Sequence, residues 1–283
     1  MEKQNSDVNR DRLSEGTQKA PPSEAQPATG AQAIHRAAAI LRALGRSNDR
    51  GAKLADLARR TGLHAATTRR ILLALCEEGL VAFEDVTKRY YLGPEVFVMG
   101  TAQPYSSWRS RFRTALTSVA GRVGDSSYLS VREGDDSLCI DRAEGREAIR
   151  IMFDIGSRLP LGAVASGVAM LAALSEAEAE SLIRANAKRF EPYERLSGEV
   201  VRQLVREARQ QGYAVTHETL LLDVAGVAVP IWGQEGQFLG AMGVALPELK
   251  ASQERCAHIA NVMLDEIRRA GGLPRVPTVT LAG

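Results

Sequence analysis

AKLADLARRTGLHAATTRRILLALCEEG, residues 52–79, is the stretch that decides the fold of the N-terminal part of the chain. Apolar residues recur at helical spacing on both sides of Gly62, and glycine favours a helix end because it readily adopts positive φ. The stretch therefore predicts two short amphipathic helices joined by a tight turn. The second helix should turn its apolar side inward and expose Arg69 and Arg70. Such a helix pair is a helix-turn-helix, a motif whose second helix fits the major groove of DNA.

The flanking residues complete a winged variant of this motif. A further amphipathic helix is predicted ahead of it, at residues 34–44. After Gly79, two short apolar runs enclose a polar turn, which predicts a hairpin with Lys88 and Arg89 near its tip. Three helices followed by a hairpin predict a winged helix-turn-helix domain over residues 32–93.

The charge distribution places a nucleic-acid interface in this same segment. Residues 32–93 hold eleven Lys and Arg against six Asp and Glu, a local net charge of +5 in a chain whose total is +2. The candidate DNA contacts are five cations and one hydroxyl donor: Lys53, Thr67, Arg69, Arg70, Lys88 and Arg89. Arginine binds both guanine edges and phosphates, and the sequence does not separate the two roles. Solvated surface arginines, and a plain solvated turn at the hairpin tip, are the alternatives.

Length and composition exclude several other classes of protein. The chain has 283 residues, 45% of them hydrophobic, which is enough for one or two domains with real cores. No apolar run approaches the roughly 18 residues of a membrane span, and there is no hydrophobic signal segment. The three widely spaced cysteines indicate buried thiols rather than disulfides or a metal site. We expect a cytoplasmic protein with no metal, no cofactor and no membrane partner.

Composition divides the chain further. Residues 1–31 are polar and rich in Pro, Ser, Gln and Glu, which predicts a disordered tail. Residues 94–124 carry helical spacing and predict linker helices. Residues 125–271 form a second domain, and residues 272–283 a flexible tail.

The second domain alternates short strands and helices. Strands are predicted at 127–132, 137–142, 148–153, 214–218, 224–232 and 238–245, and helices at 165–174, 176–187, 198–211 and 253–269. Helices gathered against a mostly antiparallel sheet predict an α+β layer.

Several segments, by their order and spacing, resemble one known family. In the first half these are LADLARRTGL (54–63), Thr67 with Arg70, and GLV with RYYLG across the hairpin; in the second half they are SYLSVRE (127–133), DSLCIDR (136–142), GSRLPLGAVASGVAML (156–171), REARQQGYAV (206–215) and GVAVPIWGQEGQFLGAMGVALP (226–247). The chain so resembles the IclR family of bacterial transcriptional regulators. The resemblance implies a winged helix-turn-helix followed by a GAF-like sensor domain. It also implies a homodimer, or a homotetramer, paired partly through the linker helices and bound to a double-stranded operator.

The resemblance further implies that the second domain holds a small organic effector, often a carboxylate. The loop leading into the helix near residue 165 forms one wall of the cleft, and helix-start amides bind anions. The candidate effector-binding residues are Leu161, Gly162, Ala163, Ser166, Gly167, Asp223, Ala225, Gly226, Gly243 and Ala245. The alternative is that the glycines merely serve turns.

Departures from the family pattern bear on the effector. Gly162 and Val168 stand where the family commonly has histidine and lysine, and three other candidate positions are small and apolar. These residues predict a roomier and more apolar pocket, suited to an aromatic or bulkier acid.

An enzyme is the competing interpretation: a small-molecule hydrolase with an accessory nucleic-acid-binding module. Ser166, His217 and Asp223 are the candidate catalytic groups, but AVASGVA does not match the G-x-S-x-G nucleophile motif. A third interpretation is an architectural DNA binder that needs no ligand. The sequence favours a non-enzymatic regulator whose operator binding responds to an effector.

Overall fold

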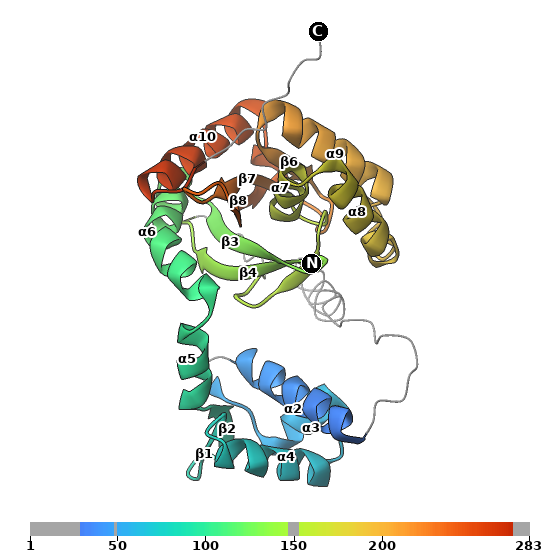
Figure 1. The fold of residues 1–283 in the computed structure, drawn as a ribbon, viewed down its shortest axis with the longest axis vertical. Coiled ribbons are helices and arrows are strands. Elements are labelled where there is room, and N and C mark those ends of the chain that lie inside the picture. Colours follow the sequence, from blue (N-terminus) through green and yellow to red (C-terminus); the bar gives the residue numbers. More distant parts are fainter. Residues whose placement is uncertain (1–28, 48–49, 147–152, 274–283) are drawn as a thin grey trace, which may run out of the picture. The chain divides into compact units, whose positions relative to one another are not determined.

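The computed structural model describes residues 29–47, 50–146 and 153–273, and the chain divides into two compact units on either side of the bond between Ser106 and Ser107 (Figure 1). The predicted tail at residues 1–28 lies outside the described residues, as do residues 274–283 and nearly all of the strand predicted at 148–153. Two tail boundaries are corrected. Residues 29–31 belong to a helix, and Leu273 pairs with Trp232 in a β-bridge.

The N-terminal unit is the predicted winged helix-turn-helix, which is confirmed. Its elements are α2 (Thr29–Gly45), α3 (Leu54–Thr61), α4 (Ala65–Glu77), β1 (Val81–Glu84), β2 (Arg89–Leu92) and α5 (Pro94–Thr101). Ile40, Leu57 and Leu72 are completely buried and join the three helices in one core. Gly62 ends α3 with φ at +67°, and this left-handed residue makes the tight turn before α4.

The linker, where sequence analysis expects helices over residues 94–124, is helical. It consists of α5 and α6 (Pro104–Val123), which are separated by residues 102–103. The break has a local cause, since a proline lacks a backbone N–H and disfavours the helical conformation of the residue before it. Pro104 is therefore the first residue of a new helix rather than a position within one.

The C-terminal unit is built on a six-stranded sheet in the order β5-β4-β3-β8-β7-β6, with every neighbouring pair antiparallel. The strands are β3 (Ser126–Glu133), β4 (Asp136–Ala143), β5 (Arg158–Pro160), β6 (Ala214–His217), β7 (Val224–Trp232) and β8 (Phe238–Pro247). The edge strand β5 lies where sequence analysis expected only a loop.

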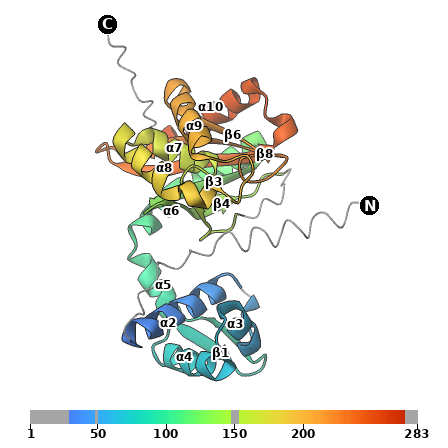
Figure 2. The same ribbon diagram turned by 90° about the vertical axis from the view of Figure 1, so that its right-hand side faces the viewer.

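Helices cover both faces of this sheet, which confirms the predicted α+β layer. One face carries α7 (Ala165–Ala173), α8 (Glu176–Phe190) and α9 (Gly198–Gln211); α6 and α10 (Gln253–Arg269) lie on the other (Figures 1 and 2). Residues 165–172 of α7 are all buried, because this helix lies between the sheet and α9. Among the described residues, no helix combines the length and apolar character needed to cross a membrane.

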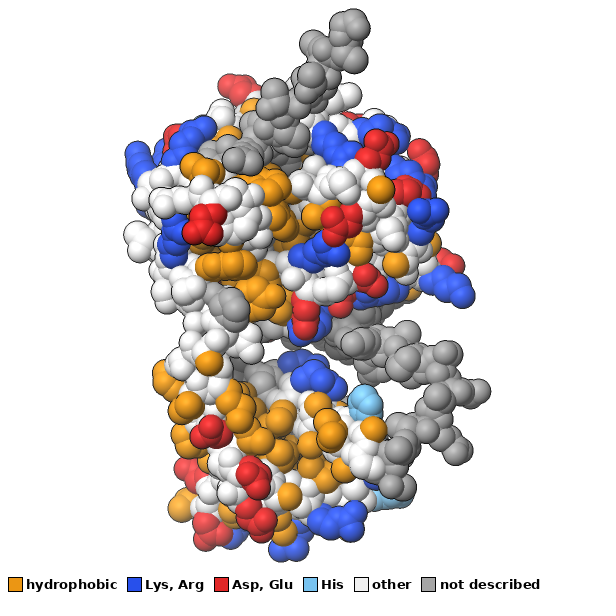
Figure 3. All heavy atoms as spheres, viewed as in Figure 1, with side chains coloured by type: hydrophobic (Ala, Val, Ile, Leu, Met, Phe, Trp, Pro, Cys, Tyr) orange, Lys and Arg blue, Asp and Glu red, His pale blue; other side chains and the backbone are white. Residues whose placement is uncertain are grey.

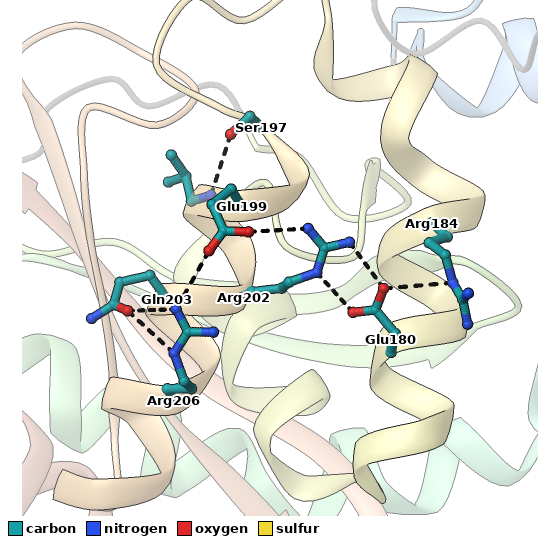
Figure 4. Close-up of polar contacts among 8 residues, drawn as sticks. Glu180, Arg184, Ser197, Glu199, Arg202, Gln203 and Arg206 are labelled. Carbon is teal, nitrogen blue, oxygen red and sulfur yellow. Dashed lines mark hydrogen bonds and ion pairs between the residues drawn. The ribbon is translucent and has the colours of Figure 1, made fainter.

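A polar clamp fixes α8 to α9 on the outside of this layer (Figure 4). Arg202 donates from Nε to Oε2 of Glu180 at 2.8 Å and from Nη2 to Oε1 at 2.9 Å. Ser197 caps α9 by accepting a hydrogen bond from the backbone N–H of Val200 at 3.2 Å. The clamp and the cap together set the position of α9, whose inner face closes over α7.

Candidate nucleic-acid interface and ligand cavity

The outer face of α4 carries the two predicted arginines. Arg69 and Arg70 are exposed, and neither makes a hydrogen bond or ion pair with another described residue. Thr68 is buried instead, with Oγ1 donating to the carbonyl of His64 at 3.1 Å. Thr67 is half-buried at the edge of this face. The helix thus presents two uncommitted guanidinium groups, which is the arrangement that groove or phosphate contacts require.

Lys53 lies at the start of α3 as its N-cap residue, exposed and without a side-chain capping bond. A cation at this end of the first helix of the pair is suited to a phosphate of the duplex backbone.

The two cations of the hairpin are already engaged within the unit. Lys88 forms an ion pair with Asp85 at 2.5 Å across the turn. Arg89 donates from Nη1 to the carbonyls of Arg50 and Gly51, at 3.1 and 3.3 Å. Arg89 therefore braces the loop before α3. A role of Lys88 and Arg89 in DNA binding stays a prediction.

A cavity opens in the C-terminal unit between the sheet and the start of α7. It encloses about 670 Å³, its open mouth included. Its wall comes from strands β3 to β8, from the start of α7 and from the loops at 153–157 and 219–221. The lining residues are Tyr128, Ser130, Ser137, Cys139, Phe153, Ser157, Leu159, Val164, Ala165, Ser166, Thr216, Thr219, Leu220, Leu221, Val224, Ala225, Gly226, Val227, Gly243, Val244 and Ala245.

Half of the predicted effector-binding residues lie in this wall: Ser166, Ala225, Gly226, Gly243 and Ala245. The other half lie outside this wall: Leu161, Gly162, Ala163, Gly167 and Asp223. Leu161 and Ala163 are fully buried in the apolar core formed with α8 and α9. Gly162, between them, has φ at +104°, and this left-handed turn faces Val201 and Phe190 rather than the cavity. Asp223 is exposed at a turn, where its carbonyl accepts the N–H of Glu248 at 2.9 Å.

Gly226 and Gly243 serve the wall in different ways. A Cβ on Gly226 would lie 2.9 Å from Oγ1 of Thr216 and 3.0 Å from Cβ of Ala165, so this glycine allows α7 to approach the sheet. A Cβ on Gly243 would lie 3.5 Å from Cβ of Ala228, an ordinary contact. A methyl group would therefore fit at Gly243 with ordinary contacts, whereas at Gly226 it would press on Thr216 and Ala165.

No residue in the described wall carries a formal charge at neutral pH. Burial, as the largest cause, raises the pKa of Cys139 to about 12, and burial likewise raises the pKa of Tyr128 to about 12. The polar groups are hydroxyls, and Ser137 and Ser166 lie 3.3 Å apart between their Oγ atoms. The first amides of α7 have no side-chain cap, which leaves backbone donors at the same end.

The groups proposed for a hydrolase are not brought together. Ser166 has Ser137 as its hydrogen-bond partner, whereas the exposed ring of His217 pairs through Nδ1 with Glu248 at 2.7 Å. The described residues also contain no cluster of three or more His, Cys, Asp or Glu side chains placed to hold a metal ion.

Sequence analysis missed the residues that β3, β4 and β6 contribute to the wall. Ser130, Ser137 and Cys139 are small residues spaced two apart or facing across paired strands, a pattern typical of any half-buried sheet. Phe153 follows the segment outside the described residues. No motif distinguishes these positions, and only the tertiary packing of α7 against the sheet brings them to one cavity.

Comparison with known proteins identifies both units. The model described as the C-terminal domain of the bacterial transcriptional regulator IclR matches residues 107–270, and that of the IclR helix-turn-helix domain matches residues 33–85. Among curated relatives, the regulator XynR of Escherichia coli K12 is 28% identical over 225 residues, covering 77% of this chain and 86% of that protein. The repressor AllR of Salmonella typhimurium LT2 is 28% identical over 245 residues, covering 83% and 87%.

Solved structures share the fold. An IclR regulator from Alicyclobacillus acidocaldarius superposes with a TM-score of 0.68 at 24% identity, over 85% of this chain and 97% of that one. An IclR homologue from Microbacterium hydrocarbonoxydans, solved in complex with 4-hydroxybenzoate, gives 0.67 at 22% identity, over 84% and 99%. Both domain models match in the expected order, and the chain belongs to the IclR family of bacterial transcriptional regulators.

Proposed function

We propose that this regulator binds operator DNA through Arg69, Arg70, Thr67 and Lys53, and that an acid with an apolar body modulates this binding from the cavity. The observation that carries the proposal is the chemistry of the cavity wall, which is apolar apart from hydroxyls, one thiol and the first amides of α7. The DNA contacts follow from the uncommitted arginines on the exposed face of α4.

The wall limits how much charge the effector carries. Burying a carboxylate without compensation is costly, and the described wall offers no cation to offset it. Hydroxyls such as Ser137 and Ser166, with the amides at the start of α7, can solvate one carboxylate. A second carboxylate would meet Val, Leu and aromatic side chains. The effector class is therefore an aromatic or bulky aliphatic monocarboxylate, a class that includes the 4-hydroxybenzoate bound by the Microbacterium homologue.

Thermal denaturation in the presence of different acids tests this class. Benzoate, 4-hydroxybenzoate and phenylacetate should raise the melting temperature in proportion to RT ln(1 + [L]/Kd). Succinate and glyoxylate, at the same concentrations, should leave it unchanged. Stabilisation by the small hydrophilic acids alone would contradict the proposed effector class.

A second copy of the chain is the partner proposed for α5. Phe97, Val98 and Met99 are 76, 55 and 54% exposed, and no residue of α5 is buried. Apolar side chains gather at this helix in the space-filling view (Figure 3). Pairing of two copies there would present two α4 helices to half-sites about 34 Å apart on the duplex. Two such dimers would form the tetramer that the family resemblance also implies. Such a regulator acts where the chromosome is, in the cytoplasm.

A further inference from the structure

Asp141 is a buried carboxylate held by two arginines of α6. Its side chain is completely inaccessible, and Oδ1 accepts hydrogen bonds from Nη1 of Arg113 at 2.7 Å and from the backbone N–H of Arg142 at 2.9 Å. Oδ2 lies 3.3 Å from Nε of Arg109 as an ion pair but accepts no hydrogen bond from the described residues. Removing a carboxylate from water costs several kcal/mol. Because loss of its partners would leave this buried charge uncompensated, the positions of Asp141 and of α6 depend on each other.

A β-bulge turns Asp141 toward α6. Leu129 pairs with Asp141 and the next residue of β3 pairs with Cys139, so Ile140 is an extra residue in β4. Ile140 lines a small apolar pocket together with Trp108 and Phe112 of α6. Two consecutive residues of β4 thus contact the same helix, although side chains of a regular strand alternate between its faces.

Two residues close to Asp141 in the sequence are connected to the cavity wall: Cys139 belongs to it, and Arg142 contacts it. Cys139 lines the cavity, and its Sγ donates to the carbonyl oxygen of Asp141 at 3.4 Å. Arg142 pairs with Asp154 at 2.9 Å, and its Nη1 lies 3.5 Å from the carbonyl oxygen of Phe153, another lining residue. A ligand that contacts Cys139 or Phe153 therefore acts on the short stretch of backbone that carries Asp141.

The arginines that contact Asp141 lie on α6, the helix that follows the DNA-binding unit in the sequence. Arg109 and Arg113 are four residues apart on α6 and so project from the same side of the helix. α6 follows α5 after residues 102–103, and α5 belongs to the winged helix-turn-helix unit.

We propose that Asp141 is the positioning residue through which the occupied cavity shifts α6 and thereby changes operator affinity. A ligand moves the bulge of β4, the carboxylate moves with it, and the arginines carry the displacement to the helix. This inference rests on the proposed function, because it requires an effector and an operator. Coupling between two such sites typically changes affinity by about 5- to 150-fold.

The chain offers a matched control on the same helix. Arg122 of α6 pairs with Glu266 of α10 at 2.8 Å, and the Glu266 side chain is only 7% exposed. This pair has the same chemistry as the contact at Asp141, but α10 contributes no residue to the described cavity wall. Asp141→Asn and Glu266→Gln both replace a buried carboxylate by an amide of nearly the same shape.

The experiment measures operator affinity with and without benzoate, 4-hydroxybenzoate or phenylacetate, and binding of the same acid by calorimetry. Asp141→Asn should bind the acid within about threefold of the wild-type affinity, while the acid-induced change in operator affinity falls below about twofold. Glu266→Gln should keep both. A full response in Asp141→Asn, or an equal loss in the two variants, would overturn the assignment.

If none of these acids binds, the proposed effector class is rejected, but the contact at Asp141 is not. Amide hydrogen exchange without ligand then still tests that contact. In Asp141→Asn, exchange should rise both in residues 109–116 and in the cavity segment 153–159. In Glu266→Gln it should rise only at the end of α6 and in α10. A rise confined to α6 in Asp141→Asn would overturn the proposed link. Should that variant exchange throughout as an unfolded chain, Arg113→Gln, altered at the half-exposed end of the contact, replaces it and is judged by the same outcomes.

Discussion

A Cβ atom on Gly162 would lie 2.7 Å from Cγ1 of Val201, and the backbone of Gly162 has φ at +104°. Both facts favour glycine here, because residues with a side chain rarely adopt this backbone conformation and there is no space for a Cβ atom. The resembled family commonly has histidine at this position. In this chain the turn instead closes onto α9, and it is part of the core rather than of the cavity.

Gly162→Ala should therefore destabilise the protein by about 2–6 kcal/mol, the sum of backbone strain and overpacking. Gly243→Ala is the matched control, since its Cβ would make only ordinary contacts, and we expect its stability to stay within about 1 kcal/mol of wild type. Urea denaturation followed by circular dichroism measures both. Equal stability of the two variants would show that the turn at Gly162 relaxes easily.

Replacing Arg70 by alanine should weaken operator binding by about 5- to 150-fold if the side chain reads a base edge. If it binds phosphate instead, specific and random duplexes should weaken alike and the salt slope should fall by about 0.9. Fluorescence anisotropy at several salt concentrations separates these outcomes, for Arg69→Ala as well.

Arg59→Ala is the control for both arginine variants, because Arg59 is exposed like them but is already paired with Asp56 at 2.9 Å. An equal loss of affinity in all three variants would indicate a general charge effect rather than contacts made by α4.

Phe97→Glu should shift the protein toward monomer at low micromolar concentration and weaken operator binding, because it places a charge in the apolar surface of α5. Leu249→Glu is the control, as Leu249 is fully exposed in the other unit. Sedimentation velocity measures the assembly state. If Phe97→Glu remains dimeric while Leu249→Glu becomes monomeric, the dimer interface lies in the C-terminal unit rather than at α5.

The clamp between α8 and α9 makes stability depend on pH. The hydrogen bonds from Arg202 hold the pKa of Glu180 below its ordinary value. A carboxyl with a lowered folded-state pKa stabilises the protein above its unfolded-state pKa, and this stabilisation is lost as pH falls through the folded-state pKa. Glu180→Gln should therefore be less stable than wild type at pH 7, and the difference should shrink in the acid range below about pH 4. A difference that is independent of pH would mean that the clamp acts through packing alone.

The parts of the fold that were predicted correctly have strong local signals. The bounds of α9, β7 and α10 match the predicted ranges, and both helices begin at a serine whose side chain caps the backbone, Ser197 and Ser252. Gly212 then ends α9 in the left-handed conformation. In these elements the hydrophobic periodicity and the residues at the ends indicate the same bounds, so the local sequence is sufficient to predict them.

The errors have the opposite character, because tertiary contacts decide them. β5 is only three residues long and exists through its pairing with β4, which no local pattern indicates. The loop before α7 was expected to face the ligand, but the left-handed turn at Gly162 directs Leu161 and Ala163 into the core. For Arg89, sequence identified a cation at the hairpin but not the backbone carbonyls of the α3 loop that it binds.

The bulge at Ile140 also affects the charge of the cavity wall. Were β4 regular, Asp141 would follow the alternation of Ser137 and Cys139 and project its carboxylate among the lining residues, where it would repel an organic acid. One surplus residue in the strand sends that negative charge to the opposite side of the sheet. The same β-bulge thus keeps a negative charge out of the cavity wall and brings Asp141 to the arginines of α6, as both the proposed acidic effector and the proposed coupling require.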